Sequence, residues 1–190
     1  MGDYKLVALD MDGTLLNHRG EISEANARAI RNALDAGVAV CFATGRGYPH
    51  VISYAEQLGL STPMVTVNGG EVWSKPGRLH SRHLLERSVV RKIYELVVPY
   101  GIWYWAYSTE GVHNRDDWVD DLESFDWLKF GVHTEDDAIR EEILSVLKSW
   151  GGLEITNSSI HNLEINPQGV SKASGVREVC RMLEIDMRQV

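Results

Sequence analysis

The stretch from Lys5 to Thr14, KLVALDMDGT, joins a short apolar run to two aspartates and a glycine. The apolar run Lys5–Leu9 has the length and composition of a strand that is buried on both faces of a parallel sheet. Asp10 and Asp12 follow this expected strand directly, and open α/β sheets bind ligands at the carboxyl ends of their strands. This one segment therefore predicts both the fold class and the place where chemistry would occur.

Two further strand and helix units follow the first strand. Val38–Ala43 and Met64–Val67 are apolar runs of the same kind, and residues at helical spacing lie between the three runs. Ser23 is expected to cap the first helix, which ends at Gly37, and the second helix ends before Gly59. A β-α-β-α-β order implies a parallel sheet with right-handed crossovers, so we expect a Rossmann-like α/β core.

The middle of the chain has a different pattern, in which two amphipathic helices alternate with short strands. Apolar residues recur at helical spacing from Val89 to Val97 and from Ala138 to Trp150. The expected strands of this region are Ile102–Tyr107, Leu128–His133, Leu153–Thr156 and His161–Ile165. We therefore expect an α+β cap of residues 83–164, inserted between core segments 1–82 and 165–190, with a last core helix over Lys172–Leu183.

The composition of the chain argues against several classes of protein. Among 190 residues, 27 acidic and 19 basic side chains give a formal charge of −8. Such a surface repels nucleic acid and anionic lipid, so neither is an expected partner. No apolar run approaches the roughly 18 residues that a membrane span needs. Cys41 and Cys180 lie in apolar stretches without metal-ligand spacing, which favours reduced thiols and, with no signal-type N-terminus, a cytoplasmic location.

Asp10 and Asp12 have the spacing that paired carboxylate chemistry requires. One carboxylate could act as a nucleophile and the other as a general acid and base, with a divalent cation offsetting their repulsion. Gly13 would let the backbone turn tightly around that ion. A calcium loop is a second interpretation, although its glycine belongs at the sixth position, where Leu15 stands. A solvated turn is the third.

Three other motifs could bind a phosphoryl group at the same edge. Thr44-Gly45-Arg46 ends the second strand with a hydroxyl and a glycine turn, which can hold phosphoryl oxygens. Lys172 lies at a predicted helix start, where a cation opposes the helix dipole, so its placement points to a use. Asn68-Gly69-Gly70 follows the third strand and could add donors. Ordinary turns and a solvated lysine are the alternatives for these motifs.

Together these motifs resemble the haloacid dehalogenase-like phosphohydrolase superfamily, and specifically its Cof-type branch. Asp10-x-Asp12-Gly-Thr resembles the first motif of the family, Thr44-Gly-Arg the second, and the segment from Gly169 to Lys172 the third. Asn68-Gly69-Gly70 resembles the turn after the third strand in this branch. The resemblance spans essentially the whole chain, because the motifs occur in family order around a cap-sized insertion.

The resemblance implies roles for individual residues. Asp10 would be the nucleophile that forms an aspartyl-phosphate, and Asp12 would protonate the leaving oxygen and later activate water. Both aspartates would bind Mg²⁺, the implied cofactor. Thr44, Gly45 and Lys172 would bind the transferring phosphoryl group. Further residues expected to contact the substrate are Arg46, Asn68 and Asn162.

The resemblance also implies a fourth motif, an acidic loop after the next core strand that completes the magnesium site. The sequence ends at Met187–Val190, where that strand would begin, so we expect a core that is incomplete at its C-terminal strands. In the family, this strand lies beside the first one. We therefore expect the far edge of Lys5–Leu9 to be exposed and to favour self-association.

The cap is expected to select the substrate. Trp103, Trp105 and Tyr107 alternate along one expected strand, and by resemblance the Asn157–Asn162 stretch lies on the cap face over the active site. A base-stacking platform is the alternative for these aromatic residues, but the chain shows no basic groove beside them.

The expected function is Mg²⁺-dependent hydrolysis of a small phosphorylated metabolite, either a sugar phosphate or a phosphorylated cofactor. One alternative keeps the fold but transfers phosphate between positions of a sugar, as phosphosugar mutases of the superfamily do. The other is a non-catalytic binding or regulatory protein, which an incomplete core would favour.

Overall fold

The computed structural model describes residues 4–190, and the chain divides into two compact units. The first unit combines the residues up to Arg82 with Ser171–Val190, and the second unit is His83–Val170. The C-terminal segment of the chain thus belongs to the same unit as the N-terminal strands, and the second unit is an insertion between them.

The first unit has a parallel sheet with a hairpin attached. Strand β1 pairs with β2 in parallel, from Leu6 opposite Ala39 to Leu9 opposite Phe42. Strand β3 continues this parallel order through a bridge between Ala43 and Val65, and β4 and β5 follow in antiparallel pairing. The elements are β1 (Leu6–Leu9), α1 (Glu24–Asp35), β2 (Ala39–Phe42), α2 (Ile52–Leu58), β3 (Met64–Thr66), β4 (Glu71–Lys75), β5 (Arg78–Arg82) and α5 (Lys172–Leu183). The expected Rossmann-like α/β class is confirmed.

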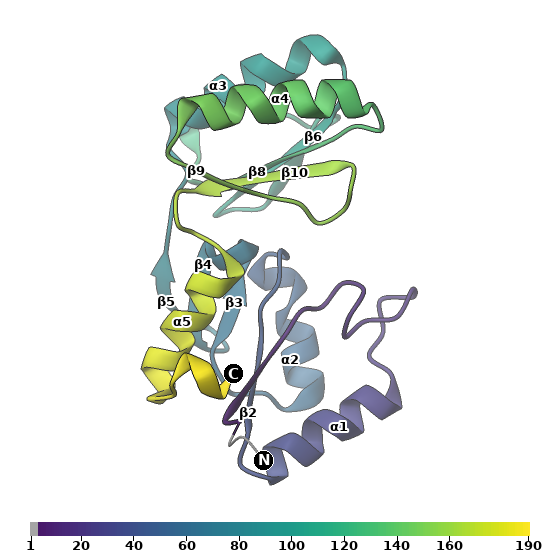
Figure 1. The fold of residues 1–190 in the computed structure, drawn as a ribbon, viewed down its shortest axis with the longest axis vertical. Helices are drawn as coiled ribbons and strands as arrows, with labels where there is room; N and C mark the ends of the chain where they lie inside the picture. Colours follow the sequence, from purple (N-terminus) through teal and green to yellow (C-terminus); the bar gives the residue numbers. More distant parts are fainter. Residues whose placement is uncertain (1–3) are drawn as a thin grey trace. The chain divides into compact units, whose positions relative to one another are not determined.

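The two faces of this sheet are covered by different helices, because strand side chains alternate in direction. Val40 and Phe42 of β2 pack in one cluster with residues of α1 and α2. Cys41 and Ala43 pack on the other side with Val176, Val179 and Cys180 of α5. Figure 1 shows α2 and α5 on opposite sides of the strands. Burial on both faces explains why β2 is a continuous apolar run.

Strand β1 lies at the edge of its sheet within residues 4–190. Its ladder partner there is β2 alone, and the Lys5 N–H donates to the Gln189 carbonyl at 2.9 Å. Leu6 is buried, whereas Val7–Leu9 are only half-buried. The open edge agrees with the expectation from the sequence, and self-association through it stays a prediction.

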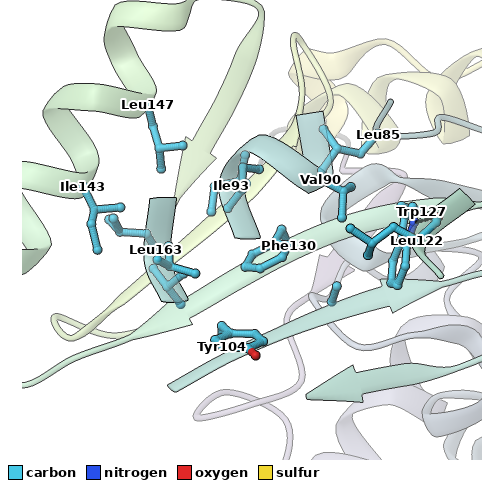
Figure 2. Packing of buried hydrophobic residues seen from close by; sticks show 14 residues of the cluster. Leu85, Val90, Ile93, Tyr104, Leu122, Trp127, Phe130, Ile143, Leu147 and Leu163 are labelled. Atoms are coloured by element: carbon cyan, nitrogen blue, oxygen red, sulfur yellow. Dashed lines mark hydrogen bonds between the residues drawn. The ribbon is translucent and has the colours of Figure 1, made fainter. Parts of the chain in front are cut away.

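The second unit is a five-stranded antiparallel sheet in the order β7-β6-β8-β10-β9, with two helices on one face. Figure 2 shows Val90 and Ile93 of α3 and Ile143 and Leu147 of α4 beside the strand that carries Phe130. The elements are α3 (Arg87–Val97), β6 (Trp103–Ser108), β7 (Val112–Asn114), β8 (Trp127–His133), α4 (Asp137–Trp150), β9 (Leu153–Thr156) and β10 (Asn162–Pro167). Short 3₁₀ turns at 48–50, 67–69, 98–100, 122–124 and 187–189 complete the list for both units.

The other face of this sheet carries aromatic and charged side chains. Lys129 Nζ lies 2.9 Å from a Glu164 carboxylate oxygen, and it also lies 4.6 Å from the ring centroid of Tyr107. Trp105 lies against Gly131, where an added Cβ would be 2.8 Å from indole Cδ2 and closer to two other ring atoms. A glycine at position 131 is therefore needed for the indole to rest on the backbone.

Two features of the second unit differ from the sequence analysis. Strand β7 was not expected, because Val112–Asn114 is only three residues long and lacks an apolar pattern. The second unit also ends at Val170, whereas the sequence analysis placed its end at residue 164. The reason is that β10 continues to Pro167, which pairs with Leu153 of β9.

Candidate active site

Asp10 lies directly after β1, and Lys172 is the first residue of α5. Lysine Nζ donates to Asp10 Oδ1 at 2.8 Å across 162 positions of sequence. The two side chains are 40% and 39% exposed, so water and small ligands can reach both. The fold therefore brings the expected nucleophile and the expected phosphate-binding lysine into contact.

Asp12 forms a second ion pair at the same edge. Arg46 contacts it through two nitrogens, with Nε 2.9 Å from Oδ2 and a terminal nitrogen 2.6 Å from Oδ1. This two-point contact lowers the pKa of Asp12 below its usual range, chiefly through the hydrogen bonds and further through the nearby charges of Arg46 and Lys172. Asp12 is therefore held as a carboxylate. The same contact raises the pKa of Arg46.

The loop between the two carboxylates is anchored by the residue that separates them. The Met11 side chain is fully buried, and its carbonyl accepts the N–H groups of Leu15 and Leu16 at 3.1 and 2.9 Å. Gly13 has φ +72°, a conformation that favours glycine. One buried side chain thus fixes the loop while Asp10 and Asp12 both remain accessible.

Thr44 is fully buried after β2, and its contacts place the loop that follows it. Its N–H donates to the Val65 carbonyl at 3.0 Å, which continues the parallel pairing with β3 past the end of β2. Its hydroxyl oxygen accepts the Arg46 N–H at 3.2 Å. Thr44-Gly45-Arg46 is therefore held at the carboxyl edge of the sheet, with the Arg46 side chain reaching Asp12.

The turn after β3 has an unusual backbone. Val67, Asn68 and Gly69 have φ values of +51°, +56° and +95°. A β-branched residue in the left-handed region is a genuine outlier, and such residues cost about 1–3 kcal/mol each and concentrate at functional sites. The Asn-Gly-Gly sequence signals a left-handed turn, but no feature of the sequence marks Val67. The left-handed conformation of Val67 is the part of this turn that sequence reasoning missed.

The donor set of this edge fits a hard divalent cation. Mg²⁺ binds oxygen ligands and is usually held by one or two carboxylates together with water and substrate phosphate. Asp10 and Asp12 provide two accessible carboxylates on one short loop. Within residues 4–190, no group of three or more His, Cys, Asp or Glu side chains could hold a metal ion. The two aspartates would therefore need oxygens from other sources to complete the coordination.

The first unit brings together most of the residues expected at the site, which come from four separate segments: Asp10, Asp12, Thr44, Gly45, Arg46, Asn68 and Lys172. Asn162 lies in the second unit, where its amide oxygen is 2.8 Å from His133 Nδ1 and its amide nitrogen donates to Ser158. Its contact with a substrate stays a prediction, as do the chemical roles of the other residues.

Comparison with known sequences identifies relatives for the whole chain. The model of the haloacid dehalogenase-like hydrolase family matches residues 7–127 and 109–190. The chain is 40% identical over 188 residues to the 5-amino-6-(5-phospho-D-ribitylamino)uracil phosphatase YcsE of Bacillus subtilis, which covers 99% of this chain and 75% of that protein. It is 34% identical over 106 residues to a phosphatase of the same name from that organism, YwtE, which covers 56% of this chain and 36% of that protein.

Solved structures agree with the fold. A haloacid dehalogenase-like hydrolase from B. subtilis superposes with a TM-score of 0.86 at 19% identity, covering 96% of this chain and 80% of that one. Among residues 4–190, no helix combines the length and the apolar character needed to cross a bilayer. The chain belongs to the haloacid dehalogenase-like hydrolase family, and the expected enzyme class, a phosphoric monoester hydrolase, is confirmed with it.

Proposed function

We propose that the carboxyl edge of the first unit hydrolyses small phosphomonoesters through an aspartyl-phosphate on Asp10. The observation that carries this proposal is the 2.8 Å contact between Lys172 Nζ and the Asp10 carboxylate, with both groups accessible to solvent. A carboxylate that attacks a phosphate dianion needs a nearby cation to offset the repulsion. Phosphoryl transfer depends mainly on such positioning and charge neutralisation.

In the first step, a carboxylate oxygen of Asp10 attacks phosphorus and the bond from phosphorus to the ester oxygen breaks. Asp12, which must first take up a proton, donates it to the departing alkoxide. In the second step, water attacks the phosphorus of the acyl phosphate, and Asp12 takes the proton from that water. Asp10 is regenerated and inorganic phosphate leaves. Thr44 and Lys172 bind the phosphoryl oxygens throughout.

Asp12 has to leave Arg46 before it can give a proton to the leaving group. The Asp12 side chain is 63% exposed and that of Arg46 28%, so the pair can open with little loss of packing. A freed guanidinium presents two parallel donors that match a phosphate. Arg46 is thus suited to move from Asp12 to the phosphoryl group as substrate binds. Asp10 and Asp12 would hold Mg²⁺, which when bound would offset the charge of the phosphoryl oxygens.

The first substrate to test is a phosphorylated ribitylaminouracil. The 40% identical relative and a second relative carry the name of a phosphatase for that compound, and this supports a phosphorylated ribitylaminouracil over a simple sugar phosphate. A phosphosugar mutase would instead return the phosphate to a sugar hydroxyl. Measuring free inorganic phosphate against phosphosugar isomers distinguishes the two reactions, and a non-catalytic binder would give neither product.

The proposal is tested by Asp10→Asn in an assay of Mg²⁺-dependent hydrolysis of an aryl phosphate. Asp10→Asn should abolish hydrolysis because an amide cannot attack phosphorus, and Asp12→Asn should reduce it by roughly 10²–10⁴-fold, the usual range for general acid and base catalysis. Asp35→Asn, an exposed aspartate at the end of α1, is the matched control and should keep the wild-type rate. A wild-type rate for Asp10→Asn would overturn the proposal.

We also propose that the chain is cytoplasmic and that a second copy pairs with the open edge of Lys5–Leu9. The two cysteines, Cys41 and Cys180, are both buried and free, which supports a reducing compartment. The half-buried apolar residues of β1 support a partner strand. Sedimentation over a range of concentrations should show a dimer, and a strictly monomeric protein would contradict the pairing.

A further inference from the structure

The left-handed turn Val67-Asn68-Gly69 touches every phosphate-binding segment of the first unit. The Val67 N–H donates to the Arg46 carbonyl and the Asn68 N–H to the Thr44 carbonyl, both at 2.9 Å. On its other side, the turn packs against α5. A single three-residue segment is therefore in contact both with the Thr44–Arg46 loop and with the helix that carries Lys172.

The contact with α5 is between backbones. A Cβ added to Gly69 would lie 2.8 Å from the carbonyl carbon of Ser171 and closer still to its oxygen. Side-chain contacts can relax by rotation, but a backbone contact can relax only if the turn or the helix start moves. Ser171 is also the N-cap of α5, and its side chain and that of Ser174 form a reciprocal capping box. The residue that Gly69 touches is thus fixed to the helix.

Lys172 directly follows Ser171, so a displacement of Ser171 displaces the base of the lysine side chain. The amine makes a 2.8 Å contact with Asp10, and a shift of about 1 Å would be enough to break it. The strained φ of Val67 is consistent with this role, because a relaxed turn would not present Gly69 at the same place.

We propose that the turn Val67-Asn68-Gly69 is a positioning element that sets Lys172 against Asp10 while holding the Thr44–Arg46 loop. Neither Val67 nor Gly69 contacts substrate in this scheme; both act through Lys172 and Thr44. The catalytic consequence rests on the proposed phosphatase function, whereas the effect on the position of Lys172 is a property of the fold.

Gly69→Ala tests the proposal, and Gly77→Ala is its matched control. Gly77 has φ +76°, and among the described residues no heavy atom beyond its chain neighbours lies within 4 Å of an added Cβ. Both variants therefore introduce alanine at a positive φ, but only Gly69→Ala introduces an overlap. Each variant is assayed for thermal unfolding and for kcat and KM with p-nitrophenyl phosphate, and a crystal structure gives the distance from Lys172 Nζ to Asp10 Oδ1.

Gly69→Ala should lower kcat by about 10²-fold, the loss expected for a displacement of about 1 Å, and should change KM much less. Its lysine should lie beyond hydrogen-bond distance of Asp10. Gly77→Ala should match the wild type in kcat and in that distance. A wild-type kcat or an intact Lys172–Asp10 contact in folded Gly69→Ala would overturn the proposal, even if its melting temperature had fallen.

Two further outcomes remain decisive. If the wild type does not hydrolyse any phosphate, the proposed function fails, and the distance measured in the crystal structure alone decides the positioning role. If Gly69→Ala does not fold, Val67→Gly replaces it, since this change relaxes the turn without adding an overlap. Val67→Gly should lower kcat by at least about tenfold as Lys172 loses its fixed position. An unchanged kcat in that variant would overturn the proposal.

Discussion

The two units of this protein each contain a lysine–carboxylate pair of nearly the same length. Lys172 and Asp10 are 2.8 Å apart in the first unit, and Lys129 and Glu164 are 2.9 Å apart in the second. The first pair is 39% and 40% exposed, whereas the second is 2% and 7% exposed. The same kind of ion pair therefore occurs once at a solvent-accessible sheet edge and once buried beside the Tyr107 ring.

This difference decides what each pair can do. An exposed pair contributes little to stability, so a ligand can separate it at low cost. A buried pair loses its hydration on folding, and removal of one partner leaves an uncompensated charge in the interior. We infer that the Lys172–Asp10 pair is exchangeable and the Lys129–Glu164 pair is permanent. Substitutions in each pair and in the side chains around them test this distinction.

The largest expected effect is on the stability of the second unit. Lys129→Met should lower the free energy of unfolding by about 3–5 kcal/mol, because the buried Glu164 carboxylate would lose the positive charge that lies 2.9 Å from it. The double variant Lys129→Met/Glu164→Leu should recover most of this loss. Urea unfolding of the single and double variants measures both quantities. A loss below about 1 kcal/mol in the single variant would show that water reaches this pair.

Lys172→Met should have the opposite effect to Lys129→Met: it should lower kcat strongly and change stability little. Its free energy of unfolding should change by less than about 1 kcal/mol, since the pair is accessible to solvent. Its kcat should fall by roughly 10²–10³-fold, the loss typical of removing one preorganised donor to the reacting group. Steady-state kinetics and urea unfolding of the same preparation give both values. A large loss of stability with a normal kcat would show that the Lys172–Asp10 pair supports the fold and is not exchanged for substrate.

A smaller effect is expected from the aromatic side chains of β6. Trp103 is 38% exposed, and Trp105 is half-buried against Gly131. If this unit selects the substrate, Trp103→Ala or Trp105→Ala should raise KM for a ribitylaminouracil phosphate by about tenfold or more. Hydrolysis of p-nitrophenyl phosphate should change far less. Substitutions in the Asn157–Asn162 loop should behave likewise, and equal losses on both substrates would argue for a purely structural role.

The smallest expected effect is on the reactivity of the buried Cys41 thiol. Burial raises the pKa of the Cys41 thiol from 9.0 to about 12. The stability that this shift reflects is present below pH 9 and is lost as the pH rises toward 12, because only the unfolded state ionises readily in that window. Native protein at pH 8 should therefore react slowly with a thiol reagent. Cys41→Ala distinguishes its signal from that of Cys180, and rapid labelling of Cys41 would show that the sheet interior opens.

Much of the fold could be predicted from the sequence, because apolar runs and helical spacing report burial directly. The strands around Val40 and Phe130 and the helix cap at Ser23 have local signals. The ion pairs could not be predicted. Nothing near Lys129 in the sequence shows that its amine will contact Glu164, since that contact depends on the register between two strands, which pairs Glu164 with Gly131.

The site shows the same limit. The motifs that contain Asp10, Thr44 and Lys172 are recognisable locally, and their convergence follows from the rule that ligands bind at the carboxyl edge of a parallel sheet. The partner of Arg46 and the conformation of Val67 depend on tertiary contacts and leave no local signal. The aspartate pair was therefore predictable as a candidate, whereas the left-handed φ of Val67 and the contact of Gly69 with Ser171 were found only in the structure.

The placement of α5 in the first unit has a consequence for synthesis of the chain. Strands β1 to β3 emerge from the ribosome long before α5, and at about 5–20 residues per second the delay is on the order of ten seconds. During that time, Cys41, Ala43 and Val65 lack the helix that covers them in the finished protein. The nascent chain thus presents an apolar sheet face that chaperones can bind, and Lys172, the first residue of α5, reaches Asp10 only when that face is covered.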